Sequence, residues 1–495
     1  MATGETTAAE LVEQGLQPRS AAQRLRDAIL DEVARLQQEE GLDRTEAIGQ
    51  LFPSTVLEER TLEVLVTSLL SGSNVLVLGP PGSGKTTLAK AVWDIFPKQL
   101  FAVSDCPVHD SPFSLVDPGY AERVPPCPYC KENHGGGEAG RPGSFDAREV
   151  DPADVPVRQI NLREGYGHAR VQGSPEVFPD NLTGSINLAR LEEVGDPTSP
   201  LVLQPGKILQ AHRGLLLVDE IGKLPRGTQN VLLQALQEGI VSPAKSRETF
   251  PADVVTVATS NYEDLGNITE PLNDRLANVQ TPFPSTAQAN RRIIRHGLEG
   301  PGRNVPGPYQ MAAVRIVMQW RDRMEGGREL SEVGSNRTLI DIVQRTASYA
   351  MAADAAQPDP DDLQRAARDA MTGRIRARSG DGFEENRLLV ERFLEEHVDE
   401  AAREGAVTYW CGFFEDELAG DESSGKRVVE HMRDIVDEHG ADPDQWAKLA
   451  ADGDEDVARF TAYVAERDDL LREQAARRLP AIWRALEDLG AFDQR

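Results

Sequence analysis

Hydrophobic and polar positions follow two rhythms along the chain, and the rhythm changes near residue 305. Before it, short apolar runs such as NVLVLG, GLLLVDE and DVVTVATSN each stop at a glycine or a polar residue, which is typical of buried parallel strands. TTLAKAVWDIF and LPRGTQNVLLQALQEG carry apolar residues at helical spacing. Strand, loop and helix therefore recur in the order of a doubly wound α/β domain, with a parallel sheet between helices.

Helical periodicity dominates the two ends of the chain. AAQRLRDAILDEVARLQQ and TLEVLVTSLLSGS predict helices ahead of the first strand. After residue 305, YQMAAVRIVMQWRDRM, NRTLIDIVQRTASYAMAADA and DPDDLQRAARDAMTGRIRAR predict three more, and Asp359 with Pro360 suits the start of the last one. The acidic stretch 381–495 also reads as helical, and its expected packing anchors are Trp410, Trp446 and Trp483.

These patterns divide the chain into four predicted regions. They are an N-terminal helical region (1–55), an α/β core (56–300), a helical lid (301–378) and an acidic helical C-terminal domain (379–495). Residues 101–150 interrupt the core, because proline, glycine and cysteine dominate there and HGGGEAGRPGS cannot be regular structure. We interpret 101–150 as an insertion.

Composition narrows the class of protein. Charged residues make up 27% and hydrophobic residues 39%, and no apolar run approaches the roughly 18–20 residues needed to cross a bilayer. The first residues resemble no secretory signal, and four cysteines are too sparse for a disulfide scaffold, so we expect a cytoplasmic protein that binds no membrane. The net charge of −28 disfavours a dedicated nucleic-acid role, and it also suits adaptation to a salty cytoplasm.

One glycine-rich stretch predicts a nucleotide site. GPPGSGKT fits G-x-x-x-x-G-K-[ST] between a predicted strand and a predicted helix. Glycines let backbone N–H groups turn toward phosphates, the lysine reaches the β- and γ-phosphates, and the threonine hydroxyl holds Mg²⁺. We therefore predict ATP and Mg²⁺ as cofactors. The residues expected at the nucleotide are Gly79, Pro80, Pro81, Gly82, Ser83, Gly84, Lys85, Thr86 and Thr87.

Polar residues end two further strands. Asp219 and Glu220 follow LLLV, where the aspartate can bind Mg²⁺ together with Thr86 and the glutamate can polarise a water. The alternative is a purely structural role, in which the acidic end of the strand caps the next helix. Asn261 ends VVTVATSN, where its amide can orient a water beside the γ-phosphate, or can simply leave the strand in a turn.

The order of these pieces resembles the AAA+ ATPases, and within them the branch of the magnesium chelatase ATPase subunit and the MoxR proteins. NLTGSINLARLEE and LVLQPGKILQAHRGLLLVDEI look like the segment that leads into that branch's Walker B strand. LQALQEGIVSPAKSRETFPADVVTVATSN resembles its hairpin followed by sensor 1, and SNRTLIDIVQRTASYAMA resembles the lid helix that begins with sensor 2. The resemblance covers roughly residues 56–375.

By that resemblance, Asn261 is sensor 1, Arg275 is an arginine finger and Arg337 is sensor 2, which with Glu220 make the expected catalytic set. An arginine finger acts on the ATP of a neighbouring subunit, so the resemblance implies a homo-oligomeric ring, expected to be a hexamer. The chain departs from the family pattern at the arginine finger, where LNDRL replaces L-L-D-R-F. It also has an unusually long separation, roughly 134 positions, between the Walker A motif GPPGSGKT and the Walker B motif LLLVDE.

The same resemblance implies an ATPase that remodels a protein client, as a chaperone or in metal insertion, with a von Willebrand factor A-domain partner. Two alternatives belong to other classes. One is a kinase or nucleotide-gated scaffold of the PrkA type, because CPVHDSP and CPYC faintly resemble a stretch of those proteins. The other is a nucleic-acid motor of the MCM type, which the acidity disfavours.

The insertion carries three of the four cysteines. Cys106 and His109 form a C-x-x-H pair, and Cys127 and Cys130 form a C-x-x-C pair, which together suit a closed, structural Zn²⁺ site like a zinc knuckle. Such a loop-rich segment lacks the apolar content to hold itself together, and metal binding supplies that energy. His134 competes for the fourth position. A redox disulfide between Cys127 and Cys130, or thiols without metal, are the other interpretations.

Overall fold

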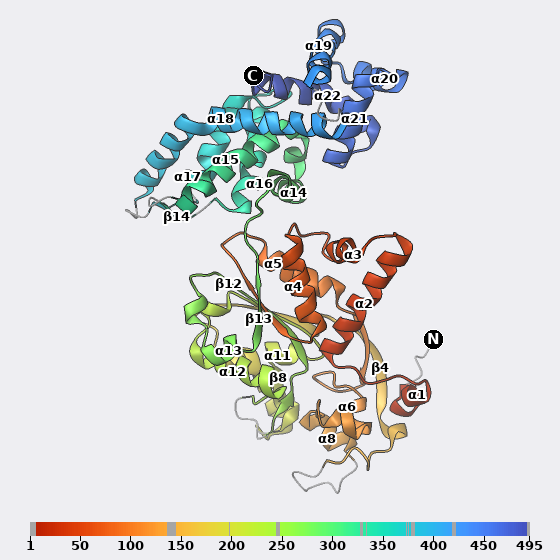
Figure 1. Cartoon of the computed structure of the whole chain (residues 1–495). Helices are drawn as coiled ribbons and strands as arrows, with labels where there is room; N and C mark the ends of the chain where they lie inside the picture. Colours follow the sequence, from red (N-terminus) through yellow and green to blue (C-terminus); the bar gives the residue numbers. More distant parts are fainter. Residues whose placement is uncertain are drawn as a thin grey trace. The chain divides into compact units, whose positions relative to one another are not determined.

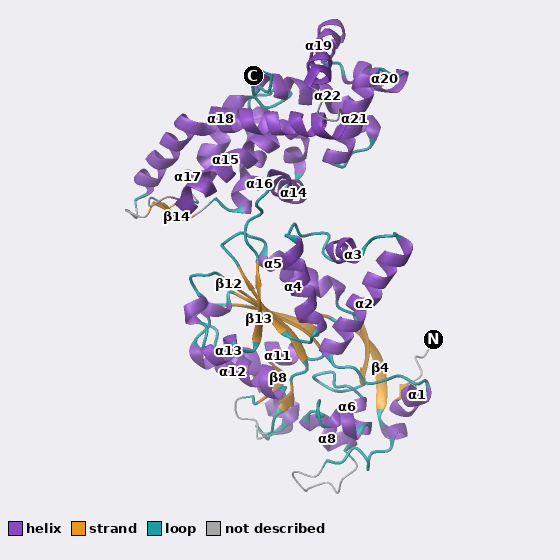
Figure 2. Cartoon of the chain, viewed as in Figure 1, coloured by secondary structure: helices purple, strands orange, loops and turns teal. Residues whose placement is uncertain are grey.

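A computed structural model of the chain describes residues 6–135, 145–197, 199–243, 248–326, 330–332, 334–372, 374, 376–377, 382–417 and 422–492. Most of HGGGEAGRPGS, which we predicted to be irregular, lies outside these residues. The chain divides into two compact units, Met1–Pro282 and Phe283–Arg495. The strands gather mainly in the first unit, and the second is almost wholly helical (Figure 2).

A six-stranded sheet forms the centre of the first unit, and all of its neighbouring strands pair in parallel. Three of the strands were predicted from short apolar runs, and they occupy central positions. The strand order is β13 (Leu276–Gln280), β2 (Asn74–Leu78), β12 (Val254–Ser260), β9 (Gly214–Asp219), β6 (Gly167–Gln172) and β5 (Arg163–Glu164).

Alternate side chains of the central strands pack into two separate apolar cores. Val75 and Val77 of β2 face one core, whereas Leu76 and Leu78 face the other. Four helices cover the first face: α2 (Ala21–Glu39), α3 (Arg44–Gln50), α4 (Glu59–Leu70) and α5 (Lys85–Ile95). The other face is covered by α9 (Pro179–Thr183), α11 (Lys207–Gln210), α12 (Arg226–Glu238) and α13 (Glu270–Asn273) (Figure 1).

The insertion leaves the core between two strands of a second, smaller sheet. This sheet has the order β1 (Thr6–Thr7), β4 (Pro156–Asn161) and β3 (Gln99–Val103), with antiparallel pairing. Three short helices lie between β3 and β4: α6 (Phe113–Val116), α7 (Pro118–Ala121) and α8 (Pro128–His134). The remaining elements of this unit are α1 (Ala8–Glu13), β7 (Gly184–Ile186), α10 (Leu188–Val194), β8 (Leu203–Pro205), β10 (Ile240–Val241) and β11 (Phe250–Pro251).

Helices of the second unit share one apolar core, in which Trp446 and Trp483 are fully buried and Trp410 lies edge-to-face on Trp483. The tryptophans therefore act as the anchors that the sequence predicts. The elements are α14 (Ala287–Gly297), α15 (Gly307–Gly326), β14 (Leu330–Glu332), α16 (Asn336–Ala352), α17 (Pro360–Thr372), β15 (Arg376–Ala377), α18 (Phe383–Glu417), α19 (Glu422–His439), α20 (Pro443–Asp452), α21 (Glu455–Asp468) and α22 (Arg472–Asp488).

The predicted fold class, a parallel sheet between helices followed by helical regions, is confirmed. The two compact units are coarser than the four predicted regions. The region 1–55 packs on the α/β core through α2, and the predicted lid and C-terminal domain share one core that also includes Ile294 of α14. Among the described helices, none is long and apolar enough to span a membrane.

Candidate functional site

Four strands of the main sheet end side by side, and their carboxyl ends bring the predicted site residues together. The register pairs near these ends are Leu78 with Ser260, Ala258 with Val218, and Gln172 with Asp219. The glycine-rich loop follows Leu78, Asn261 follows Ser260, and Glu220 follows Asp219. Parallel pairing thus converts residues far apart in sequence into neighbours, at the sheet edge where α/β proteins bind ligands.

The glycine-rich loop adopts a backbone that only glycine tolerates well. Gly82 and Gly84 have φ of 74° and 97°, in the left-handed region. A Cβ on Gly79 would lie 2.4 Å from the hydroxyl oxygen of Thr281, so this position also requires glycine. The buried Lys85 side chain folds back on the loop: its Nζ donates to the carbonyl oxygens of Gly79 and Pro80, both at 2.8 Å.

Asn261 joins the loop through the same lysine, because its Oδ1 accepts from Lys85 Nζ at 2.9 Å. Thr86 lies in the first turn of α5, and its hydroxyl donates to the Asp219 carboxylate at 2.9 Å. The structure therefore brings together Lys85, Thr86, Asp219 and Asn261. Their roles toward a nucleotide stay predictions.

The carboxylate of Asp219 accepts hydrogen bonds from three side chains. Besides Thr86, it accepts from the hydroxyl of Thr259 at 2.6 Å and from a guanidinium nitrogen of Arg170 at 2.6 Å. Burial alone would raise the pKa of Asp219, but the hydrogen bonds from Thr259, Arg170 and Thr86 and the charge of Arg170 lower it. The carboxylate is thus held ionised, as a cation ligand must be.

Glu220 lies beside Asp219 but points to other partners. Its backbone is left-handed, with φ of 53°, and its N–H donates to the hydroxyl of Thr259 at 3.0 Å. Its carboxylate accepts from Gln172 Nε2 at 2.9 Å and from Lys223 Nζ at 3.0 Å. The side chain is one-third exposed, so water reaches it.

Arg275 lies at the opposite end of the sheet from the glycine-rich loop. It precedes Leu276, which pairs with Asn74 at the start of β2, whereas the loop follows Leu78 at the end. At about 3.3 Å per strand residue, this separation is roughly 15 Å, beyond the reach of an arginine side chain. Arg337 belongs to the second unit, where it lies in the first turn of α16 with an exposed side chain.

Arg170, Gln172 and Thr259 were not predicted from the sequence. Thr259 lies within the VVTVATSN run, one position before the serine that precedes Asn261. Arg170 and Gln172 lie on β6, whose alternation GHARVQ is too polar to stand out as a buried strand. Their contacts depend on the pairing of β6 with β9, which the local sequence of β6 does not predict.

The cysteine-rich insertion forms a buried cluster. Cys106, Asp110, Cys127 and Cys130 each offer a ligand atom, all within 4.8 Å of one another. Burial alone would raise the pKa of Cys106, but hydrogen bonds from the thiols of Cys127 and Cys130 lower it to about 6, while the pKa of those two thiols is raised. The redox disulfide is not formed in this structure, in which all three thiols are free.

The predicted ligand His109 is not part of this cluster. Its backbone is left-handed, with φ of 48°, and its ring turns away, so that Nε2 lies 2.6 Å from the carbonyl oxygen of His212 and the ring packs on Tyr166. Burial lowers the pKa of His109 to about 3, so the ring is neutral. His134, the alternative ligand, also lies outside the cluster.

Asp110 takes the place that we predicted for His109. One of its carboxylate oxygens accepts from the backbone N–H of Cys127 at 2.6 Å. The other lies 3.5 Å from His212 Nε2, and neither of these two buried atoms has a hydrogen-bond partner among the described residues. An orphaned carboxylate oxygen beside three thiols fits a bound cation, because the ion would satisfy it.

Comparisons with known proteins find one matching family model and several similar proteins. The sigma-54 interaction domain family matches residues 198–276, the segment around Asp219 and Asn261. The magnesium-chelatase 38 kDa subunit of Acidiphilium rubrum is 28% identical over 254 residues, which cover 50% of this chain and 63% of that protein. The archaeal Lon protease of Methanocaldococcus jannaschii is 21% identical over 301 residues, covering 46% of this chain and 45% of that protein.

Among solved structures, the complex between subunits BchI and BchD of magnesium chelatase contains a similar chain. It aligns at 20% identity with a TM-score of 0.33, covering 68% of this chain and 98% of its own length. The present chain spans less than two thirds of the length of both curated relatives named above.

The fold and the sequence matches together support the predicted class, an AAA+ P-loop protein. Within that class, the chain is related to the ATPase subunits of magnesium chelatase.

Proposed function

We propose that this chain is a ring-forming AAA+ ATPase that hydrolyses ATP and uses the turnover to remodel a protein partner. The observation that supports the proposal best is the meeting of Lys85, Thr86, Asp219 and Asn261 at one sheet edge, with Glu220 adjacent. A lysine, a hydroxyl, two carboxylates and an amide are the groups that phosphoryl transfer to water requires.

The glycine-rich loop is the proposed phosphate cradle. Backbone N–H groups next to Gly82 and Gly84, and the start of α5, offer donors and a positive helix end to an anion. Lys85 Nζ, now bonded to two carbonyl oxygens and Asn261, would exchange these acceptors for phosphate oxygens. The loop would thus bind and orient the nucleotide without large rearrangement.

Thr86 and Asp219 are the residues that would hold Mg²⁺, since hydroxyl and carboxylate oxygens are its preferred protein ligands. Their hydrogen bond of 2.9 Å already brings the two oxygens to one place. When bound, the ion supplies positive charge that neutralises the phosphate oxygens. Asp219 stays ionised in this structure, which fits the role.

Glu220 is the proposed residue that orients and deprotonates the attacking water. In this structure Gln172 donates to one of its carboxylate oxygens and Lys223 to the other, and because each oxygen has two acceptor sites, the carboxylate can still accept from a water. Asn261 would orient the same water through its amide.

The position of Arg275 supports the proposed ring. Because Arg275 lies roughly 15 Å along the sheet from its own glycine-rich loop, it cannot reach the nucleotide of its own chain. A second copy that brings Arg275 to this loop would complete the site, and repetition of such a head-to-tail contact closes a ring when the rotation between neighbours divides a full turn. We propose a hexamer, as the AAA+ resemblance implies.

Mixing two inactive variants tests this arrangement. We expect Arg275→Ala and Glu220→Gln each to lose turnover alone, because every interface then lacks either the finger or the water-orienting carboxylate. In an equimolar mixture of exchanging subunits, about a quarter of the interfaces pair two intact residues, so turnover should return to about that fraction. ATP hydrolysis measured across mixing ratios checks it, and a mixture as inactive as its components contradicts a finger in trans.

Arg170 supports a separate prediction about Mg²⁺. Its guanidinium lies 2.6 Å from the Asp219 carboxylate, where it competes with a metal ion for the same oxygen. We expect Arg170→Gln to lower the Mg²⁺ concentration that gives half-maximal ATP turnover, by several-fold. Arg158→Gln, on the exposed side of β4, is the control. A higher Mg²⁺ requirement in Arg170→Gln would show that the arginine assists the metal rather than competing with it.

We also propose that the insertion holds a structural Zn²⁺ through Cys106, Asp110, Cys127 and Cys130. Three thiolates and one carboxylate can fill the four positions of a tetrahedral zinc ion. The cluster is fully buried, and His212 lies beside the carboxylate, as an outer-shell partner of a metal ligand does. The site is closed, so its role would be to stabilise the insertion.

We propose that the ring acts together with a protein partner. The AAA+ resemblance suggests a von Willebrand factor A-domain protein, and the solved relative is named as a complex of two different magnesium chelatase subunits. The client, a chaperone or metal-insertion role, and the cytoplasmic location stay predictions.

A further inference from the structure

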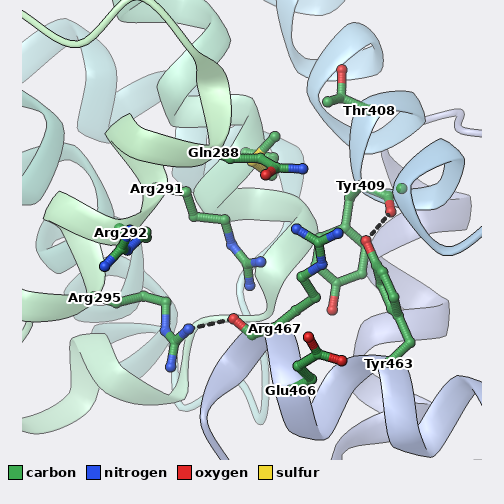
Figure 3. Close-up of a pocket in the computed structure, with 11 residues that line it drawn as sticks. Gln288, Arg291, Arg292, Arg295, Thr408, Tyr409, Tyr463, Glu466 and Arg467 are labelled. Atoms are coloured by element: carbon green, nitrogen blue, oxygen red, sulfur yellow. Dashed lines mark hydrogen bonds between the residues drawn. The ribbon is translucent and has the colours of Figure 1, made fainter. Parts of the chain in front are cut away.

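The second unit contains a cavity of about 340 Å³ between α14, α18 and α21. Figure 3 shows arginines of α14 on one side and two tyrosines on the other, with Arg467 and Glu466 at α21. This volume is within the range of cavities that bind small molecules. The residues that carry the argument are Arg291, Arg292, Arg295, Arg467, Tyr409 and Tyr463.

Four guanidinium groups and one carboxylate line this cavity, in a chain whose net charge is −28. Arg291 is buried and pairs with Asp468. Arg295 donates to the carbonyl oxygen of Arg467 and lies 4.0 Å from the carboxylate of Asp469. No carboxylate among the described residues lies within ion-pair distance of Arg292. Arg292, whose side chain is exposed, therefore adds a positive charge to the lining that no described carboxylate pairs with.

Two buried donors at this place also lack acceptors. The hydroxyl of Tyr409 and the Nε of Arg291 have no hydrogen-bond partner among the described residues, and the two residues are 2% and 7% exposed. A buried polar group without a partner is destabilising, because it has lost its hydrogen bonds to water. Burial raises the pKa of Tyr409, so its hydroxyl stays protonated and can donate. Both atoms are enclosed in this structure, and an anion with several acceptor oxygens would satisfy them once the side chains move to admit it.

We propose that this cavity binds a small phosphate-bearing anion. Arginine forks match phosphate oxygens in geometry, and the aromatic walls of Tyr409 and Tyr463 exclude water from the contact. A plain structural reading, in which basic residues stabilise the C-terminal end of α14, accounts for Arg295 but not for the unpartnered hydroxyl of Tyr409. A large acidic partner is disfavoured, because the net charge of the chain repels it at longer range.

Pyrophosphate is the probe for this site. Isothermal titration of the full chain, with the glycine-rich loop saturated by Mg²⁺ and ADP, should detect its binding. The double variant Arg292→Gln/Arg295→Gln should weaken binding at least about tenfold, because each guanidinium contributes charge-assisted contacts. The matched control is Arg403→Gln, an exposed arginine of α18 outside the cavity, which should bind as the parent does.

Tyr409→Phe provides a second variant that keeps the packing. Because only the unpartnered hydroxyl is removed, the melting temperature should hold or rise, while affinity for pyrophosphate falls several-fold. Orthophosphate and AMP, titrated in parallel, show whether the site prefers a free phosphate or a phosphate ester. Failure of pyrophosphate, orthophosphate and AMP to bind the parent chain, or equal affinity in parent and double variant, overturns the proposal. The readout is independent of ATP turnover.

Discussion

Replacing Glu220 with glutamine is expected to lower ATP turnover by at least about 100-fold, the usual range for a residue that orients and deprotonates water. The amide keeps the size of the side chain but cannot accept the proton. Nucleotide binding should persist, because Glu220 bonds Gln172, Lys223 and Thr259 rather than the glycine-rich loop. Phosphate release and binding of a fluorescent ATP analogue measure the two effects separately.

The matched control for this variant is Glu238→Gln. Glu238 ends α12, is exposed, and accepts a hydrogen bond only from the side chain of Gln234 among the described residues. The same chemical change there should leave turnover unaltered. If Glu220→Gln hydrolyses ATP at nearly the parent rate, the assignment of this carboxylate is wrong. If Glu220→Gln loses binding as well, Glu220 has a structural role instead.

The second large effect is expected at the cysteine cluster. Cys127→Ser should remove bound zinc from the purified protein, and the loss should cost on the order of 3 kcal/mol, or about 6–12 °C in Tm. Cys127 is fully buried, so the serine hydroxyl would be both a poor ligand and a polar group without its metal. Metal analysis and thermal unfolding of parent and variant check the two parts.

Cys411→Ser is the control, since this half-buried cysteine of α18 lies in the other unit and should affect neither zinc nor stability of the first unit. Two further variants identify the fourth ligand. Asp110→Asn should weaken zinc retention against a chelator, whereas His109→Gln should not, because the ring of His109 faces His212 and Tyr166. The opposite result would restore the ligand set predicted from the C-x-x-H spacing. A parent protein without metal contradicts the site altogether.

The central strands and the glycine-rich loop could be predicted because their patterns are local. β2, β9 and β12 are short apolar runs that end in chemically distinctive residues, and GPPGSGKT is a continuous motif. The predicted cap of α17 is local too: the N–H of Asp362 donates to the Asp359 side chain. In each case a few consecutive residues carry the whole signal.

The outer strands could not be recognised in this way. β6 and β13 lie nearer the edges of the sheet, and their patterns GHARVQ and LANVQ mix polar and apolar residues. Because β6 was not recognised as a strand, Arg170 and Gln172 were not recognised as site residues. Their side chains donate to Asp219 and Glu220, respectively. The sequence offered His109 or His134 for the fourth position of the cysteine cluster, whereas the structure places Asp110 there, because the left-handed backbone of His109 turns the adjacent side chain toward the thiols.

The sequence by itself therefore determined the class of the core and the residues Lys85, Thr86, Asp219 and Asn261, since consecutive motifs and short apolar periods encode them directly. Only the tertiary structure decided which residues hold the two carboxylates, which side chain completes the cysteine cluster, and that arginines from α14 and α21 meet in one cavity. These features depend on strand register, on one backbone dihedral angle and on helix packing. None of the three produces a periodic pattern of residues in the sequence.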